Sequence, residues 1–116
     1  MVVQRDSWMS QLRRGTIEFC VLALLRDGER YAYELVRTLA RADGLVTSEG
    51  TVYPLLSRLQ RAGLVTSSQR PSSQGPARRY YRLTEDGRVA LGSFVAQWER
   101  FRDTVDQLVF KGGSLP

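Results

Sequence analysis

The residues best suited to binding chemistry are six arginines between Ser48 and Arg82. Only one acid, Glu49, accompanies them, so this stretch has a net charge of +5, equal to that of the whole chain. A guanidinium donates paired hydrogen bonds to phosphate, and a local excess of such groups is typical of nucleic-acid-binding surfaces. A solvated basic surface without a phosphate partner has the same composition. The arginines are Arg58, Arg61, Arg70, Arg78, Arg79 and Arg82.

Catalytic and metal-binding chemistry has few candidates in this chain. There is no histidine, the commonest general base and metal ligand, and a single cysteine does not make a thiolate zinc site. Neither of the glycine-rich phosphate-binding motifs occurs. The sequence therefore predicts a protein that is not an enzyme and uses no metal or cofactor. Cys20, inside an apolar run, is either a core residue or a redox-sensitive thiol.

A helix from Glu49 to about Ala62 is expected to position the first of these arginines. Ser48 is a suitable N-cap, and Gly63 suits the position just beyond the C-terminal end. The face opposite the apolar stripe of this helix carries small, hydroxyl-bearing and cationic side chains. It includes a tyrosine near the helix start, which is unusual on a surface that contacts only water. The apolar residues, spaced at i, i+3, i+4 and i+7, are Val52, Leu55, Leu56 and Leu59.

A second helix, from about Ala32 to Ala42, precedes this one, and a hairpin follows it. The second helix is expected to bury Leu35, Val36, Leu39 and Ala40. We expect strands at Leu64–Ser68 and Arg78–Leu83, joined by a polar turn at Gln69–Ala77. In the second strand, Tyr81 and Leu83 face one way, and Arg78, Tyr80 and Arg82 the other. A basic hairpin directly after a helix-turn-helix is a wing.

The first and last helices carry more apolar surface than a small domain needs. The first, from about Ser10 to Arg26, is apolar on several sides, and the last, capped by Thr84, has a heptad seam. The simplest account is that two copies of the chain pack together. The expected interface residues are Phe19, Leu22, Leu91, Phe94, Trp98, Phe101, Val105 and Leu108.

These elements predict a mostly α fold with a small β-hairpin. We expect a winged helix-turn-helix domain in residues 1–84, a C-terminal dimerisation helix in 85–110 and a disordered tail in 111–116. The chain lacks an apolar run long enough to span a membrane and lacks a signal-peptide core, which favours the cytoplasm and no membrane partner.

Three strings in the chain closely resemble the PadR family. They are the EGTVYP string of Glu49–Pro54, the RYYRLT string of Arg79–Thr84, and the YAYEL string of Tyr31–Leu35, where Ala32 replaces the usual glycine. The resemblance extends from about Arg13 to Leu108. It implies a homodimeric winged helix-turn-helix repressor of the short subfamily, binding double-stranded DNA at a near-palindromic operator.

The resemblance also implies which residues bind DNA. The third helix would enter the major groove with its N-terminal residues at base edges, and the wing arginines would follow the backbone or enter the minor groove. The expected residues are Ser48, Glu49, Gly50, Thr51, Tyr53, Pro54, Ser57, Arg58, Arg61, Arg78 and Arg79.

Some short members bind flat aromatic compounds between paired tryptophans of the last helix, and Trp98 is at the matching position. The resemblance thus implies a planar aromatic effector, with Gln11, Arg14 and Phe101 near Trp98. Arg14 stands where drug-binding members often have a small residue, and Pro76-Ala77 departs from their wing. Alternatively, Trp98 is a large interface anchor without a ligand.

Two other functions remain open on the sequence alone. A winged-helix module can use its basic surface for a protein partner, and its binding would lack a steep dependence on salt. The apolar seam and Trp98 also fit a small-molecule carrier without DNA regulation.

Overall fold

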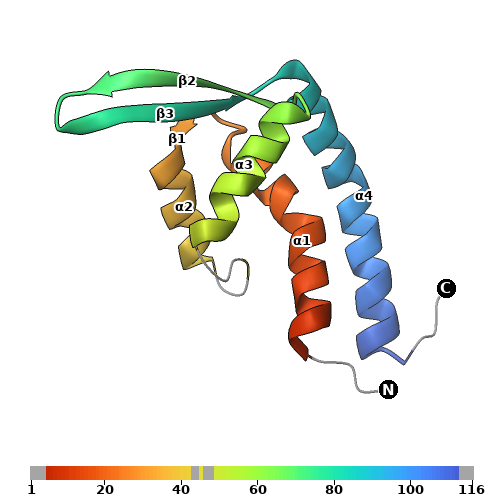
Figure 1. The fold of residues 1–116 in the computed structure, drawn as a ribbon. Helices are drawn as coiled ribbons and strands as arrows, with labels where there is room; N and C mark the ends of the chain where they lie inside the picture. Colours follow the sequence, from red (N-terminus) through yellow and green to blue (C-terminus); the bar gives the residue numbers. More distant parts are fainter. Residues whose placement is uncertain (1–4, 43–44, 46–48, 113–116) are drawn as a thin grey trace.

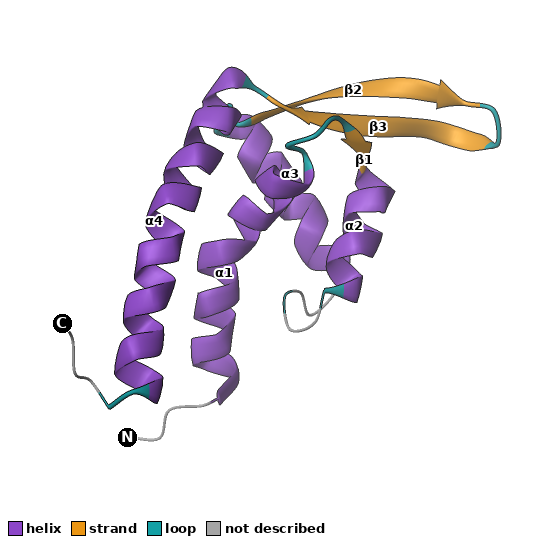
Figure 2. Cartoon of the chain, turned by 180° about the vertical axis from the view of Figure 1, so that it is seen from behind, coloured by secondary structure: helices purple, strands orange, loops and turns teal. Residues whose placement is uncertain are grey.

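The computed structural model describes residues 5–42, 45 and 49–112. Its helices and strands alternate in the order of a winged helix-turn-helix followed by a long helix (Figure 1). Figure 2 shows the same arrangement from behind, with α1 and α4 side by side and the hairpin projecting beyond α2. The elements are α1 (Arg5–Leu24), β1 (Arg30–Tyr31), α2 (Ala32–Arg41), the 3-10 turn η1 (Glu49–Thr51), α3 (Val52–Arg61), β2 (Val65–Ser72), β3 (Gly75–Leu83) and α4 (Glu85–Phe110).

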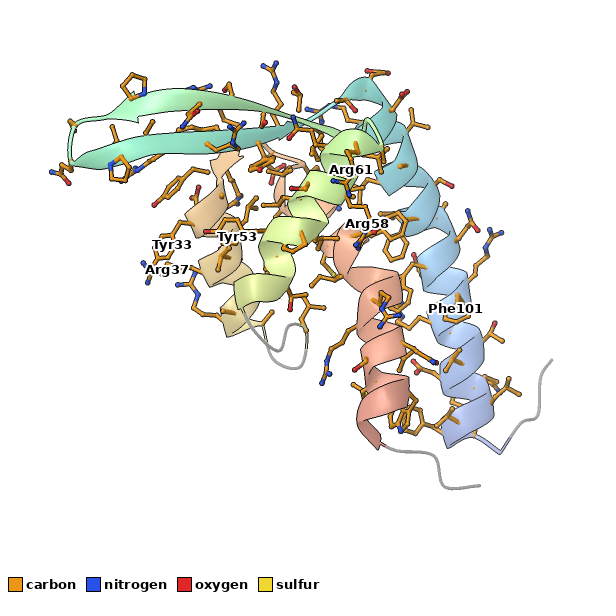
Figure 3. All side chains as sticks on the ribbon, viewed as in Figure 1. Tyr33, Arg37, Tyr53, Arg58, Arg61 and Phe101 are labelled. Carbon is orange, nitrogen blue, oxygen red and sulfur yellow. The ribbon has the colours of Figure 1, made fainter. Side chains whose placement is uncertain are left out.

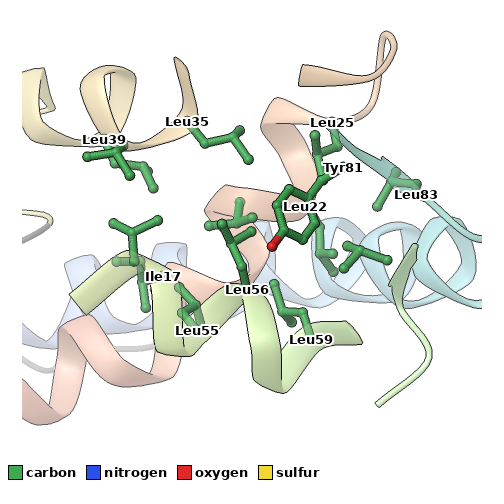
Figure 4. Packing of buried hydrophobic residues seen from close by; sticks show 14 of the residues in the cluster. Ile17, Leu22, Leu25, Leu35, Leu39, Leu55, Leu56, Leu59, Tyr81 and Leu83 are labelled. Atoms are coloured by element: carbon green, nitrogen blue, oxygen red, sulfur yellow. The ribbon is translucent and has the colours of Figure 1, made fainter. Parts of the chain in front are cut away.

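The core lies where α1, α2 and α3 meet the base of the sheet (Figure 4). The predicted stripe of α3 is confirmed, since its four apolar side chains are all at most 2% exposed. In α2 the prediction is wrong for Ala40, which is exposed. Burying one such leucine or valine contributes about 1.5–3 kcal/mol, so these contacts hold the three helices together. The buried residues are Ile17, Val21, Leu22, Leu25, Leu35, Val36, Leu39, Val52, Leu55, Leu56, Leu59, Val65, Tyr81, Leu83 and Leu91.

Gly63 ends α3, as the sequence predicts. Its φ of +79° lies in the left-handed region, which glycine adopts without a Cβ clash. The backbone N–H of Leu64 donates to the carbonyl of Leu59, and that of Gly63 donates to Gln60, both at 3.0 Å. This pair of bonds is a Schellman motif, and it turns the chain from α3 directly into β2.

The sheet has the strand order β1-β3-β2, and both pairings are antiparallel. The hairpin is longer than predicted: Ser72 pairs with Gly75, so only Ser73 and Gln74 connect the strands. The predicted turn at Gln69–Ala77 is therefore mostly strand. The Pro, Gly and Ser residues of this segment are typical of a turn, and the segment lacks the alternation of apolar residues that indicates strands. Residues 69–77, which we call the distal hairpin, need no such alternation because they do not pack against the core. The register shifts around Pro71, which has no N–H for the ladder.

The start of α4 is fastened to the end of α3 and the start of β2. Thr84 caps α4 as predicted, its Oγ1 accepting from the N–H of Gly87 at 3.0 Å. The same hydroxyl donates to the carbonyl of Gly63 at 2.6 Å, and the N–H of Thr84 donates to Leu64 at 3.1 Å. A Cβ on Gly87 would overlap the Leu64 carbonyl oxygen. We call the contacts of Thr84 and Gly87 with Gly63 and Leu64 the α4 clasp.

Two residues expected at a dimer interface belong instead to the core of the single chain. Leu22 is 0% exposed and Leu91 is 5% exposed, so neither offers surface to a second copy. The several-sided apolar character of α1 has a simpler origin than predicted. One side of α1 packs on the core and another on α4, within the same chain.

Candidate nucleic-acid interface

The face of α3 opposite the core is open, as the sequence predicts. The expected contact residues on η1 and α3 whose side chains the structure describes are all exposed: Gly50, Thr51, Tyr53, Pro54, Ser57, Arg58 and Arg61. Glu49 contributes its backbone to η1, and Ser48 lies outside the described residues. Small side chains at the start of α3 leave room for the edge of another molecule to approach the backbone.

Arg58 is not an isolated cation on this face. Its Nε donates to Oε1 of Glu18 on α1 at 2.9 Å, and both side chains are substantially exposed (Figure 3). An exposed pair of this kind is weak, because water competes for both charges. Arg58 can therefore exchange Glu18 for an external anion. Arg61, three residues further on at the C-terminal end of α3, is also exposed.

The two wing arginines expected to act together lie on opposite faces of β3. Side chains alternate along a strand, so Arg79 shares the side of the buried Tyr81, and Arg78 shares the side of Tyr80. Arg79 donates to the Ser67 hydroxyl at 3.0 Å. Burial raises the pKa of the Tyr81 hydroxyl, and the nearby Arg79 charge opposes that rise.

On the other face of the hairpin, cations stack on tyrosines. The Arg78 guanidinium lies 4.6 Å from the ring centre of Tyr31, and the Arg70 guanidinium lies 4.5 Å from that of Tyr80. Arg70 also donates from both terminal nitrogens to the two carboxylate oxygens of Glu29, at 2.5 and 2.7 Å. This bidentate bond holds the pKa of Glu29 below its usual value and ties the hairpin to the loop after α1.

The sequence did not lead us to expect that α2 contributes side chains to this candidate nucleic-acid interface. Tyr33 is 51% exposed, and Arg37, one turn along, lies 5.8 Å from its ring centre. Figure 3 shows Tyr33 and Arg37 along one edge of α2, with Tyr53 of α3 nearby. A hollow of about 470 Å³ lies between Tyr33, Tyr53 and the distal hairpin, and both Arg78 and Arg79 line it. An exposed tyrosine and arginine four residues apart were the available signal.

The residues expected to bind an effector fall into two places. Trp98 is half-buried and stands in an aromatic row between Phe94, at 5.6 Å between ring centres, and Phe101, at 6.0 Å. Arg14 instead lines a groove between α1 and α3. Gln11 is exposed on α1. Within one chain, the expected grouping of Arg14 with Trp98 is therefore not formed, because Arg14 turns towards α3.

The aromatic row begins on α1, where Phe19 stacks on Phe94 with ring centres 4.2 Å apart and planes at 4°. These two expected interface residues are thus engaged within one chain. Beyond Trp98, the distal part of α4 leaves its apolar seam open. Phe101 is 60% exposed, and Val105 and Leu108 are exposed beside it, with Val109 and Phe110 beyond.

Cys20 is half-buried on α1 and packs against the core. Burial raises the pKa of its thiol, which lowers the thiolate fraction and with it the reactivity. Of the two interpretations left open by the sequence, this environment favours core packing.

No helix within the described part of the chain is both long and apolar enough to cross a membrane.

The order α2, α3, hairpin defines a winged helix-turn-helix protein. The profile of the transcriptional regulator PadR-like family matches residues 21–93, well over half of the chain. The chain belongs to this family, whose members are transcriptional regulators and not enzymes. It is also 40% identical over 83 residues to the transcriptional regulator Rv3488 of Mycobacterium tuberculosis, covering 72% of this chain and 76% of that protein.

Solved structures agree with this assignment. A PadR-like transcriptional regulator from Bacillus cereus superposes with a TM-score of 0.76 at 36% identity, covering 86% of this chain and 97% of that one. A PadR family regulator from Eggerthella lenta gives 0.75 at 37% identity, covering 90% and 91%. Bacillus subtilis PadR, solved in complex with operator DNA, shares the fold with a TM-score of 0.63 at 23% identity, over 69% of this chain and 45% of that one.

Proposed function

We propose that this regulator binds specific DNA sequences as a homodimer and represses the genes it controls. The observation that carries the proposal is the open face of α3, flanked by Arg79 on the hairpin and by Tyr33 and Arg37 on α2. Tyr33, Tyr53, Arg78 and Arg79 line one hollow, and Arg37 lies beside Tyr33. Cationic and hydroxyl donors, the groups that contact phosphate and sugar, are therefore gathered on this face. Repression rests on the family resemblance rather than on the geometry.

In the proposed complex, α3 lies in the major groove. Gly50, Thr51 and Ser57 meet base edges, because they are small and lie on the exposed face. Tyr53 and Arg61 contact the backbone on either side of them. Arg58 leaves Glu18 for a phosphate, and Arg79 follows the backbone from the wing.

The homodimer forms through the distal seam of α4. Phe101, Val105 and Leu108 are an apolar surface that a second copy would cover. Two-fold symmetry would then place two recognition helices on half-sites about 34 Å apart, which requires a near-palindromic operator.

A planar aromatic effector would bind beside Trp98, between the two copies. The proposal rests on the open seam next to Trp98, and Phe94 and Phe101 on either side would stack with the same ligand. Titration of planar dyes while following tryptophan fluorescence tests it, because Trp98→Ala should remove the saturable quenching. Quenching that persists in Trp98→Ala would leave Trp98 as a packing residue.

DNA binding is tested by measuring affinity against salt with operator and unrelated DNA. If a dimer neutralises about six phosphates, log K against log salt falls with a slope near −5. Arg79→Ala should weaken binding to all sequences and flatten the slope. Arg78→Ala should do so less, because the Arg78 guanidinium already stacks on Tyr31.

Changes at Gly50 or Ser57 should instead alter which sequence is preferred. A flat salt dependence would overturn the proposal in favour of a protein partner. Equal losses from Arg78→Ala and Arg79→Ala would show that the wing contacts DNA through both faces.

A further inference from the structure

Glu18 is an acid that lies directly against the proposed recognition helix. It is on α1, and its Oε1 atom accepts from Nε of Arg58 on α3 at 2.9 Å, on the side of α3 that faces α1 (Figure 3). The side chains of Glu18 and Arg58 are 31% and 52% exposed, so both groups reach the surface where a phosphate would bind Arg58. DNA that contacts Arg58 therefore meets a carboxylate as well as a guanidinium.

The backbone that carries Glu18 is held on two sides. Ile17, the residue before it, is 4% exposed in the core, and Phe19, the residue after it, stacks on Phe94 of α4. Consecutive residues of a helix point about 100° apart, since there are 3.6 residues per turn, and these three accordingly reach the core, α3 and α4. DNA can displace the Glu18 side chain from Arg58, but α1 keeps the carboxylate within a side-chain length of that place.

Glu18 can act on DNA binding in two opposite ways. As a positioning residue it would hold Arg58 ready for a phosphate, and its loss would weaken binding. As a competitor it would occupy Arg58 in the free protein and repel the phosphate in the complex, so its loss would strengthen binding. One hydrogen bond in an exposed pair orders a side chain little, whereas the charge of Glu18 acts on any phosphate that reaches Arg58. The geometry favours competition.

We propose that Glu18 is a built-in competitor of DNA phosphate, which occupies Arg58 in the free regulator and lowers its affinity for every DNA sequence. The inference rests on the proposed function, because it requires that α3 binds DNA. Phosphate contacts carry no sequence information, so the loss of affinity is the same on operator and on unrelated DNA. Contacts to base edges add affinity on the operator alone. Glu18 thus suppresses binding elsewhere while operator binding persists.

The exchange of Glu18 for phosphate also changes the salt dependence. A phosphate that binds Arg58 releases its counterion, but the carboxylate that Arg58 leaves takes up a cation from solution. The wild type therefore releases fewer ions than its number of phosphate contacts indicates. Without the carboxylate, the slope of log K against log salt should be steeper by about one to two for a dimer, at about 0.9 per phosphate.

The experiment uses the full chain and two labelled duplexes, one rich in A·T and one rich in G·C, with fluorescence anisotropy measured against salt. Neither duplex has to contain the operator, because the proposed effect is independent of sequence. Glu18→Gln removes the charge and keeps the shape and an acceptor oxygen, so circular dichroism should be unchanged. At low salt this variant should bind both duplexes about threefold or more tightly than the wild type. The gain should shrink as salt rises.

Two controls locate the effect at Arg58. Glu99→Gln removes the same charge from an exposed position on α4, outside the heptad seam, and should bind like the wild type. Arg58→Met should weaken binding to both duplexes. Glu18→Gln added to Arg58→Met should gain clearly less than it gains in the wild type, because the pair that it breaks no longer exists.

Each other outcome overturns the inference. Weaker binding of Glu18→Gln would make Glu18 a positioning residue, and unchanged binding would leave it without a role. An equal gain in Glu99→Gln would assign the effect to net charge, and an equal gain in the Arg58→Met background would place it outside the pair. If the wild type and Glu18→Gln both fail to bind either duplex at low salt, the proposed function fails as well. Binding of the wild type without a gain in Glu18→Gln overturns this inference alone.

Discussion

The winged-helix body and the distal half of α4 use apolar side chains in opposite ways. In the body, fifteen apolar residues from every described element except η1 and β1 are buried together within one chain. In α4 beyond Trp98, the apolar side chains are exposed, with Phe101 at 60% and Phe110 at 78%. The body buries its apolar side chains within one chain, whereas the distal helix leaves its own exposed, as a surface that contacts a partner does.

This difference indicates in which region of the molecule the contribution to stability should depend on protein concentration. Removing a core contact from the body should lower the free energy of unfolding by the same amount at any protein concentration, because no second molecule is involved. Removing a contact from the distal seam should matter only where a second copy is bound. The following predictions test this division, from the largest expected effect to the smallest.

Leu56→Ala should have the largest effect on the body. Leu56 is 0% exposed on α3 and is surrounded by the core, so its truncation leaves a cavity. Urea unfolding should show a loss of about 2–5 kcal/mol, the range for buried leucine. The loss should be the same at two protein concentrations tenfold apart. A loss that changes with concentration would show that the body itself depends on the partner.

Phe101→Glu with Val105→Glu should break the seam without unfolding the body. Each side chain contributes about 1.5–3 kcal/mol when fully buried, and a carboxylate there would lose hydration. Sedimentation should show a folded monomer of this variant at micromolar concentration, where the wild type should be a dimer.

The matched control for the seam is Arg100→Gln with Arg102→Gln, which lowers the net charge by the same two units. Both positions are exposed on α4, beside the seam and not in it, so this variant should remain dimeric. A wild type that is already a well-folded monomer would remove the basis for the comparison.

Gly87→Ala tests the joint between the two regions. A Cβ there would overlap the Leu64 carbonyl oxygen, so the α4 clasp must open or shift, at a cost of about 1–3 kcal/mol. Gly92→Ala is the control, because open space surrounds a Cβ at that position on the same helix. It should stabilise the protein by up to about 1 kcal/mol through helix propensity. Equal effects in thermal unfolding would contradict the role of the clasp.

Glu29→Gln should have the smallest effect, since the Glu29–Arg70 pair is exposed. The folded state lowers the pKa of Glu29, so its contribution to stability is complete above the ordinary value of 4.5 and is lost as pH falls through the lowered value. The difference in melting temperature between wild type and Glu29→Gln should therefore be present at neutral pH and vanish in acid. A difference that grows on acidification would contradict this sign.

Much of this fold was predictable from short stretches of sequence, because the residues concerned interact with residues that are close to them in the chain. The stripe of α3, the cap at Thr84 and the C-terminal Gly63 each depend on short-range geometry, and all three are confirmed. The long hairpin was missed because its strands pair with each other and not with a core. The burial of Leu22 and Leu91 was missed because a heptad pattern does not reveal which chain covers it.

The candidate site likewise has parts that the sequence predicts and parts that it does not. The exposed face of α3 follows from the stripe on the opposite side, so it was predictable. The partners of Arg58 and Arg70 were not, because Glu18 and Glu29 lie 40 and 41 residues away in the sequence. The separation of Arg14 from Trp98 required knowing that α1 has one side towards α3 and another towards α4.

The α4 clasp also gives the long helix a mechanical property. A helix of 26 residues is about 39 Å long, at 1.5 Å per residue, and the clasp fixes only its first turn. The helix α4 can act as a lever that pivots at the carbonyl groups of Gly63 and Leu64, which follow the end of α3. A sideways movement of about 3 Å at the far end corresponds to a rotation of about 4° about that point. A movement of the distal seam would therefore reach the end of the recognition helix through the clasp, and would also reach α1 through the stack of Phe94 on Phe19.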